Sequence, residues 1–235
     1  MGFLSYVRGM ITWGIANDRV CSGITTVKSD KRQLAAHLQI SEHAICTVHQ
    51  VHGTGVVCID RDDHNPLFNA EIEADAIVTN TTNFCIAVKV ADCCGIVLYD
   101  PTSSVIAVVH SGWRGTAKGV VSATISTMQT VFDVDPTNLH AWLSPCASAA
   151  RYQVGTDVFS VLRGYCTPDT SAVNRWFFDN HHALCDELRS FDVQPNSIVC
   201  STECTIANPS YHSYRRDGAA AGRGLVFAKL SGAVT

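Results

Sequence analysis

Short runs of β-branched and other apolar residues dominate the first half of the chain. Runs of this length, bounded by polar or glycine-containing turns, are typical of strands. The predicted strands are residues 44–51, 55–59, 76–79, 84–90, 96–99 and 105–110. The Asp-Pro-Thr-Ser sequence at residues 100–103 is typical of a turn, and it predicts a hairpin-like connection between the last two runs.

Helical spacing of apolar residues begins after these strands. Over residues 116–132 apolar residues recur every three or four positions, which predicts the clearest helix of the chain. Two further helices and two further strands are expected at residues 157–164, 178–191, 139–143 and 197–199. Because strands and helices mix without strict βαβ alternation, the expected fold class is α+β, or mixed α/β. No long linker divides the sequence, so we expect a single compact domain over residues 1–235, with a mixed sheet and flanking helices.

The composition indicates a globular protein and argues against two classes of partner. Of the 235 residues, 46% are hydrophobic and 16% are charged, and the formal net charge is −4. The longest apolar runs, such as residues 84–88, are far shorter than the roughly 20 residues of a membrane-spanning helix. Basic residues form no cluster larger than a pair such as Arg215 and Arg216, so neither a membrane nor nucleic acid is an expected partner.

The cysteines and the amino-terminal segment indicate a cellular location. The chain has 11 cysteines, an odd number, and a chain of this length does not need disulfide staples. The first residues include Arg8 and lack the small-residue pattern of a secretory cleavage site. We therefore expect a reducing, cytoplasmic setting in which most of the cysteines are small buried apolar residues.

Three residues with metal-ligand chemistry follow predicted strands: His52, Cys93 and His110. Strand ends of one sheet tend to meet at one rim, so folding could bring the three together. Their separations are too long for a zinc finger, but two imidazoles and a thiolate suit Zn²⁺ and leave a fourth position open for water. Copper is also compatible with these ligands. On spacing alone, three unrelated and partly buried side chains are the more common explanation.

The segment from His110 to Gly115 joins a predicted strand to the clearest predicted helix. Small residues at such a junction let backbone N–H groups approach a ligand at the positive end of the helix. Arg114 offers a bidentate partner for phosphate or carboxylate. The alternative is a tight turn in which Arg114 is merely solvated.

Short motifs occur along the chain in the order in which one family has them. They are Gln50-Val51-His52-Gly53, Ala74-Asp75-Ala76, Ala91-Asp92-Cys93, His110-Ser111-Gly112-Trp113-Arg114-Gly115-Thr116, Ser144-Pro145, Tyr152-Gln153-Val154-Gly155, Cys204-Thr205, Ser213-Tyr214-Arg215-Arg216-Asp217 and Gly222-Arg223. Over residues 44–230 the chain thus resembles the bacterial YfiH/YlmD-like proteins and their mammalian relative FAMIN, once described as multicopper polyphenol oxidases of laccase type. Each motif is weak alone, but the ordered set is specific.

The resemblance implies a zinc site formed by His52, Cys93 and His110, with copper as the other candidate metal. It also implies a purine nucleoside phosphorylase for adenosine, inosine and methylthioadenosine, with zinc-dependent deamination of adenosine as a second activity. The expected partners are a purine nucleoside and phosphate, and the expected assembly is a monomer or a homodimer.

The chemistry of phosphorolysis indicates which residues would bind substrate. Phosphate must be held beneath the sugar C1′, and an oxocarbenium-like sugar must be stabilised. Arg114, together with Arg215 or Arg216, is therefore expected to bind the anion. Gln50, two residues before His52, is expected to contact the substrate.

Cys93, His110 and Asp92 are the expected catalytic residues. A zinc-bound water with a pKa near about 7 could supply the hydroxide that deamination at C6 requires. Asp92 would act either as a general acid/base or as a carboxylate that caps the turn. Cys94 should face away from the metal because successive strand side chains point to opposite faces. His181 lies in a polar stretch and is expected at the surface.

Two other functions remain open. A copper-dependent polyphenol oxidase would fit the older family description, although one three-ligand site cannot supply the several coppers that a laccase uses. A metal-free hydrolase would use Cys93 as nucleophile and His110 as base, an arrangement suited to acyl transfer.

Overall fold

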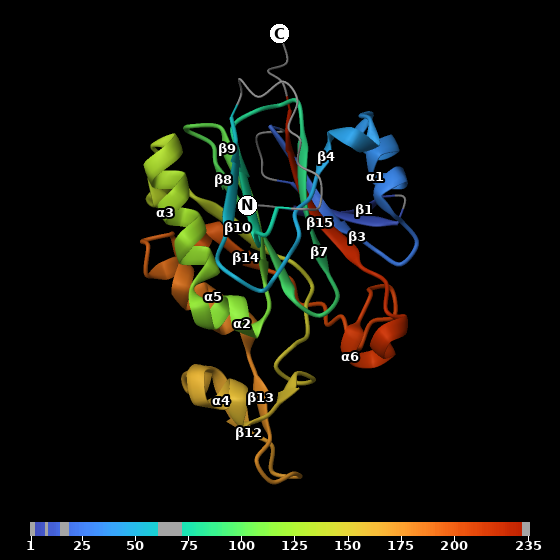
Figure 1. The fold of residues 1–235 in the computed structure, drawn as a ribbon, viewed down its shortest axis with the longest axis vertical. Helices are drawn as coiled ribbons and strands as arrows, with labels where there is room; N and C mark the ends of the chain where they lie inside the picture. Colours follow the sequence, from blue (N-terminus) through green and yellow to red (C-terminus); the bar gives the residue numbers. More distant parts are fainter. Residues whose placement is uncertain (1–2, 8, 15–18, 61–71, 232–235) are drawn as a thin grey trace.

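Two six-stranded sheets form the centre of the protein, seen in a computed structural model that describes residues 3–7, 9–14, 19–60 and 72–231 (Figure 1). In spatial order, the first sheet contains β1 (Phe3–Val7), β2 (Met10–Gly14), β3 (Val20–Thr25), β15 (Gly224–Leu230), β7 (Cys85–Val90) and β4 (Ile45–Cys46). Only β4 pairs in parallel in this sheet, against β7.

The second sheet is also mixed. In spatial order it contains β14 (Ile198–Cys200), β10 (His140–Leu143), β8 (Cys94–Asp100), β9 (Val105–Ser111), β6 (Ala76–Thr79) and β5 (Val56–Ile59). The predicted hairpin is present, because β8 and β9 pair antiparallel across the turn after Asp100. The two edge strands, β14 and β5, are the ones that pair in parallel.

The described residues form the helices α1 (Lys31–Leu38), α2 (Trp113–Lys118), α3 (Val120–Phe132), α4 (Thr156–Leu162), α5 (Asn180–Arg189) and α6 (Tyr214–Asp217). Of these, α1 covers the outer face of the first sheet, and α3 and α5 cover that of the second (Figure 1). Short 3₁₀ turns are η1 (Glu42–Ala44), η2 (Pro136–Asn138), η3 (Arg163–Tyr165), η4 (Pro195–Ser197) and η5 (Gly218–Ala220). A small sheet of β11 (Gln153–Val154), β13 (Trp176–Phe178) and β12 (Cys166–Pro168) lies with α4 at one end of the molecule.

The second sheet is buried on both faces, between the first sheet and the layer of α3 and α5, which explains its continuous apolar runs. Within β9, Ile106 and Val108 pack toward the first sheet, whereas Ala107 and Val109 pack toward α3 and α5. A strand that is buried on both faces needs apolar residues at every position rather than at every second one. At about 25 cal/mol per Å² of buried apolar surface, this double burial makes the middle layer the main source of hydrophobic stabilisation.

The predicted mixture of helices with mixed sheets is confirmed, but two predicted elements are wrong in extent. The helix expected over residues 116–132 is two helices, because Gly119 has φ 78° and ends α2 before α3 begins. The strand expected over residues 44–51 is only β4, since the chain then leaves the sheet and forms the loop that carries His52. Among the described residues, no helix combines the length and apolar character needed to cross a bilayer.

Candidate active site

His52 lies on a loop that one buried carboxylate holds in shape. Asp75, just before β6 and fully buried, accepts N–H groups from Val51 at 3.2 Å, His52 at 3.0 Å and Gly53 at 2.6 Å. His52 has φ 56°, a left-handed backbone that non-glycine residues seldom adopt. The three hydrogen bonds sustain this conformation, so Asp75 decides where the His52 ring lies.

The same carboxylate orients the second imidazole. His110, near the end of β9 and almost fully buried, donates its Nδ1–H to Asp75 Oδ1 at 2.7 Å. Burial alone would lower the pKa of His110, but its hydrogen bonds with Asp75 and Cys93 raise that pKa to about 9. A carboxylate on one ring nitrogen leaves the other, Nε2, as the ligand atom, which is the usual arrangement of histidines that bind metals.

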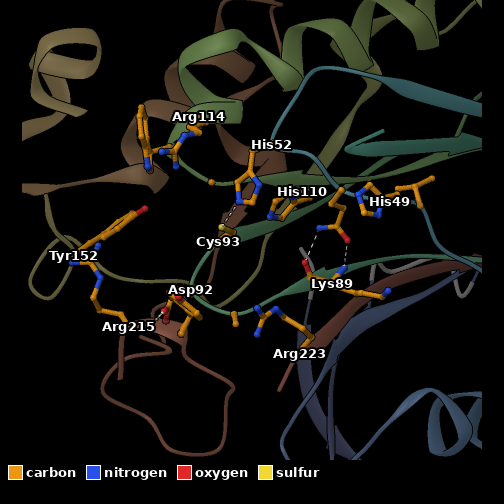
Figure 2. A pocket seen from close by; sticks show the side chains of 16 residues that line it. His49, His52, Lys89, Asp92, Cys93, His110, Arg114, Tyr152, Arg215 and Arg223 are labelled. Atoms are coloured by element: carbon orange, nitrogen blue, oxygen red, sulfur yellow. Dashed lines mark hydrogen bonds between the residues drawn. The ribbon is translucent and has the colours of Figure 1, made fainter. Parts of the chain in front are cut away.

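Cys93 completes the group in the turn between β7 and β8 (Figure 2). Its Sγ lies 3.9 Å from His52 Nε2, and the ligand atoms of His52, Cys93 and His110 all lie within 4.8 Å of one another. Burial raises the pKa of the Cys93 thiol, but hydrogen bonds from the two histidines outweigh it and lower the pKa to about 7. The structure therefore brings together the three residues that the sequence indicated.

The way the chain brings them together differs from the expected rim of one sheet. His52 lies on the connection from β4 to β5, and Cys93 on the connection from β7 to β8, so both segments cross from the first sheet to the second. His110 alone lies on a strand. The site is thus at the end of the sandwich where the chain changes layers.

A pocket of about 540 Å³ opens beside these three residues. Pockets for small molecules commonly have 300 to 1,000 Å³, so a nucleoside-sized ligand fits by this measure. Its lining combines the three ligands with basic and aromatic side chains, namely Lys89, Arg114, Arg215, Arg223, Trp113, Tyr152 and Tyr214.

Three of the arginines lie against aromatic rings. The guanidinium carbon of Arg114 is 4.2 Å from the ring centre of Trp113, that of Arg215 is 5.3 Å from Tyr152, and that of Arg223 is 5.9 Å from Tyr214. Such stacking holds a cation in place without neutralising its charge. The pocket therefore offers fixed positive charge for an anion and flat apolar surfaces for a planar group.

Comparison with known proteins identifies the family of this chain. A family profile described as multi-copper polyphenol oxidoreductase laccase matches residues 19–231. The chain belongs to this family. Its likeness to the YfiH/YlmD proteins, expected from the motifs, is thereby confirmed.

Relatives in this family bear the name purine nucleoside phosphorylase. One from Xylella fastidiosa (strain 9a5c) is 33% identical over 174 residues, which are 72% of this chain and 65% of the relative. One from Corynebacterium glutamicum is 32% identical over 206 residues, which are 86% of this chain and 80% of the relative. The chain spans less than two thirds of the length of the Xylella protein.

Two solved structures share the fold. Bacillus licheniformis hypothetical protein YfiH superposes with a TM-score of 0.85 at 21% identity and covers 96% of this chain and 97% of its own. YlmD from Geobacillus stearothermophilus also has a TM-score of 0.85, at 23% identity, and covers 97% and 98%. The mixed sheets with flanking helices are therefore the fold of this laccase-type family.

Other residues singled out in the sequence have definite places in this family member. Asp92 accepts from Thr205 Oγ1 at 2.7 Å and from the backbone N–H of Arg215 at 2.6 Å, so both of its oxygens hold loops together. Gln50 lines the pocket, but its amide is bonded in both directions to the backbone of Lys89, at 2.8 and 2.7 Å. Of the two roles considered for Asp92, the geometry favours the cap.

The side chains of Arg215 and Arg216 lie in different surroundings. Arg216 donates to the carbonyls of Thr205 and Tyr211 and is paired with Asp217 at 2.7 Å, and it does not line the pocket. Arg215 lines the pocket beside Tyr152. The choice between them as anion ligand therefore falls on Arg215, and the expectation that Arg216 contacts phosphate is dropped.

Sequence reasoning missed several residues of the pocket. Asp75 and Arg223 occur in the family motifs, but nothing in their spacing revealed that one orients two ligands and the other faces the pocket. Lys89 is the exposed position of the otherwise buried strand β7, and it belongs to none of the motifs. Tyr152 is mostly buried, and this burial together with the nearby Cys93 raises the pKa of its phenol. The position of Tyr152 in a family motif was the feature of the sequence that could have indicated its place in the pocket.

The backbone at Gly112 lies against two of the three candidate metal ligands, Cys93 and His52. A Cβ there would lie 2.7 Å from Cys93 Sγ and 3.3 Å from His52 Cδ2. Its φ of −84° is open to any residue, so Gly112→Ala tests the contact alone. Because the new methyl group displaces the sulfur, we expect Zn²⁺ affinity to fall about 10- to 100-fold, as measured by competition with a chelator.

The matched control is Gly164→Ala, whose Cβ meets nothing within 4 Å. It should bind Zn²⁺ like the unaltered protein. Equal affinity in the two alanine variants would show that this group of side chains does not hold the ion.

Proposed function

We propose that this protein is a purine nucleoside phosphorylase that acts on adenosine and inosine, with methylthioadenosine as a further substrate and zinc-dependent deamination of adenosine as a second activity. The observation that carries the proposal is one pocket that joins a cluster of metal ligands to stacked arginines and aromatic rings. The relatives named purine nucleoside phosphorylase support it. All 11 cysteines are free, which fits a reducing cytoplasm as its setting, and we propose a monomer or a homodimer as its assembly.

The arginines account for the phosphate. In phosphorolysis, a phosphate oxygen forms a bond to C1′ while the bond from C1′ to the base breaks, and the pair of electrons leaves with the base. Arg114, which stacks on Trp113, and Arg215, which stacks on Tyr152, can bind the attacking anion. Fixed cations at this point also raise the local concentration of phosphate.

The aromatic side chains account for the nucleoside. Trp113 and Tyr152 line the pocket, and a purine can stack on an aromatic ring with about 1–3 kcal/mol of stabilisation. Stacking does not distinguish adenine from hypoxanthine, which fits the breadth of substrates that we propose. Asp92 and Gln50 contribute by holding the pocket walls in position.

The ligand cluster fits Zn²⁺. One thiolate and two imidazoles are borderline-soft donors, Asp75 orients both histidines, and the cluster faces the pocket rather than the core. When bound, Zn²⁺ would supply a Lewis acid and a water that ionises at neutral pH. His52, Cys93 and His110 would hold it. Copper is the alternative metal, and elemental analysis of the purified protein decides between them.

Product analysis tests the proposed reaction. The protein is incubated with adenosine, with and without phosphate, and adenine, inosine and hypoxanthine are separated by chromatography. Adenine and ribose 1-phosphate that form only with phosphate support phosphorolysis, and inosine formed without phosphate supports deamination. If none of these products forms, the proposal is wrong.

Arg114 is the residue whose loss should affect phosphate specifically. We expect Arg114→Ala to raise the KM for phosphate about 10- to 100-fold, since a hydrogen bond between charged groups contributes roughly 1.5–3 kcal/mol. The KM for the nucleoside should change little. Steady-state kinetics with phosphate varied at saturating adenosine measures the effect.

Arg32→Ala, at an exposed position of α1 far from the lining residues, is the control. It should leave both constants unchanged. An unaltered phosphate KM in the Arg114 variant would remove Arg114 from the anion site.

A metal-free Cys/His hydrolase is the second function that the geometry favours, because Cys93 has a lowered pKa and contacts His110. The two proposals differ in what stops the enzyme. A chelator should inactivate the phosphorylase and iodoacetamide should act slowly while Zn²⁺ is bound. Acyl hydrolysis by the metal-free protein, lost rapidly when Cys93 is alkylated, would support the hydrolase.

A further inference from the structure

A second group of sulfur and nitrogen ligands lies behind the first. The ligand atoms of Cys94, Cys146 and His181 lie within 4.8 Å of one another, and none of the three lines the pocket. We propose that these residues form a second metal site, which takes a thiophilic closed-shell ion such as Zn²⁺ or Cu⁺. The proposal does not depend on the reaction proposed for the pocket.

The fold explains how adjacent cysteines serve separate sites. Cys93 faces the pocket, while Cys94 begins β8 and points to the opposite face, into the core shared by α3 and α5. Cys146 follows β10, the neighbour of β8, and lies in the same core. His181 enters from the first turn of α5, which packs over these strands. Three segments distant in the sequence therefore supply the ligands.

The distances are those of a compact ligand set. Cys146 Sγ lies 3.3 Å from His181 Nε2, and in a tetrahedral zinc site, with bonds of about 2.0–2.3 Å, two ligand atoms lie about 3.5–3.8 Å apart. In this structure His181 Nε2 also donates to the Ser144 carbonyl at 3.0 Å. Binding of an ion would replace that partner and draw the three ligand atoms, which lie within 4.8 Å of one another, toward this spacing.

The surroundings select a soft ion. Cys94 is 0% and Cys146 2% exposed, in a core of aliphatic residues, and His181 retains partial exposure at its edge. No carboxylate belongs to the ligand group, so hard cations such as Mg²⁺ and Ca²⁺ are disfavoured. Two thiols and one imidazole are ligands that zinc and Cu⁺ prefer. The partly exposed His181 gives the ion an approach to the site.

Two more cysteines adjoin the group and could complete the coordination of zinc. Cys185 Sγ and Cys200 Sγ are 3.3 Å apart. Cys185 is one helical turn after His181 and so lies on the same face of α5. Cys200 is opposite Leu143 of β10 and is close enough to interact electrostatically with Cys94 and Cys146. Neither sulfur belongs to the group whose ligand atoms all lie within 4.8 Å of one another, so either would have to move toward the ion to become a fourth ligand, and Cys94, Cys146 and His181 are the ligands that we assign.

Electrostatics agrees with this assignment. Hydrogen bonding with Cys94 and the nearby His181 imidazole lower the pKa of the Cys146 thiol, against the effect of burial, and so favour the thiolate, the form of cysteine that binds metals.

Metal stoichiometry of the full chain tests the proposal. The protein is reduced, freed of metal, loaded with excess Zn²⁺ or with Cu⁺ under anaerobic conditions, desalted, and analysed by plasma mass spectrometry. We expect two equivalents of Zn²⁺ in the unaltered protein, and one each in Cys146→Ser and in Cys93→Ser. Cys166→Ser, a partly buried cysteine of β12 outside both groups, should retain two.

The Cys93→Ser variant isolates the second site. Its remaining ion should show at least two sulfur neighbours by X-ray absorption, whereas the ion left in Cys146→Ser should show one. His181→Gln guards against misfolding, because it removes one ligand at a partly exposed position and should also lose one equivalent.

Each outcome bears on one site. Loss of all metal in Cys93→Ser, or two equivalents retained in both Cys146→Ser and His181→Gln, would overturn the second site. One equivalent that survives in Cys93→Ser and disappears in Cys146→Ser would support the second site while refuting metal binding in the pocket.

Discussion

Replacing Cys93 with serine is expected to lower kcat/KM for adenosine by at least about 10³-fold. The thiolate is the one anionic ligand of the pocket cluster, and a serine hydroxyl does not ionise near neutral pH to replace it. Loss of the metal removes several kcal/mol of electrostatic stabilisation, and each 1.4 kcal/mol is tenfold in rate. Steady-state kinetics with the metal content of the same sample measures both effects.

The control for this prediction is Cys166→Ser, which should keep full activity. Thermal unfolding of the metal-free Cys93 variant should resemble that of the metal-free unaltered protein, because Cys93 is partly exposed in a turn and fills no core position. A folded Cys93→Ser protein with more than a tenth of the original activity would contradict the role of the cluster.

Replacing Asp75 with asparagine is expected to damage both stability and the metal centre. Asp75 accepts four N–H groups, those of Val51, His52, Gly53 and His110. An asparagine side chain has one acceptor oxygen and turns an NH₂ group toward two of these donors. At roughly 1–3 kcal/mol for each buried group left unpaired, we expect a loss of about 2–5 kcal/mol in the free energy of unfolding.

The same substitution should weaken Zn²⁺ binding about 10- to 100-fold, because carboxylates that orient histidine ligands contribute this much to affinity. Urea denaturation of the metal-free protein and a chelator competition measure the two effects separately. Asp100→Asn is the matched control, since Asp100 is also a buried carboxylate that caps a turn, between β8 and β9. It should lose stability and keep its metal affinity. Equal affinities in the two variants would mean that Asp75 only supports the fold.

The elements that the sequence predicted best are those with one dominant physical signal. The strand at residues 76–79 has the predicted bounds, and β9 extends the prediction by one residue, because both consist mostly of apolar residues and are buried along their whole length. The amino-terminal strands, β15 and α1 were not predicted. Their positions depend on distant segments: β15 pairs with β3 and β7, and α1 packs on the first sheet.

The pocket was predicted in part for a similar reason. Motif order identified His52, Cys93, His110 and Arg114, whose residue types carry recognisable chemistry. It could not show that Arg216 is bound up with carbonyl groups while Arg215 faces the pocket. Neighbouring residues of one helical turn point in different directions, and only the packing of α6 decides which direction is the pocket.

The group formed by Cys94, Cys146 and His181 shows most clearly what could not be predicted from the sequence. Cys94 faces away from the first site, as strand alternation predicted. His181 was expected at the surface, but it is half-buried, because α5 packs against the sheet and places that ring 3.3 Å from Cys146 Sγ. The polar character of the stretch did not show which of its residues lie toward the sheet.

By itself the sequence predicted the fold class, the family and the three candidate metal ligands, because apolar periodicity, motif order and side-chain chemistry are local properties of a chain. The tertiary structure alone decided that Asp75 orients two of those ligands, that Gly112 admits the sulfur, and that Cys94, Cys146 and His181 meet behind them. These relations join segments far apart in the sequence. Their physical reason is the packing of two sheets and a helix layer, which sets distances that no local pattern records.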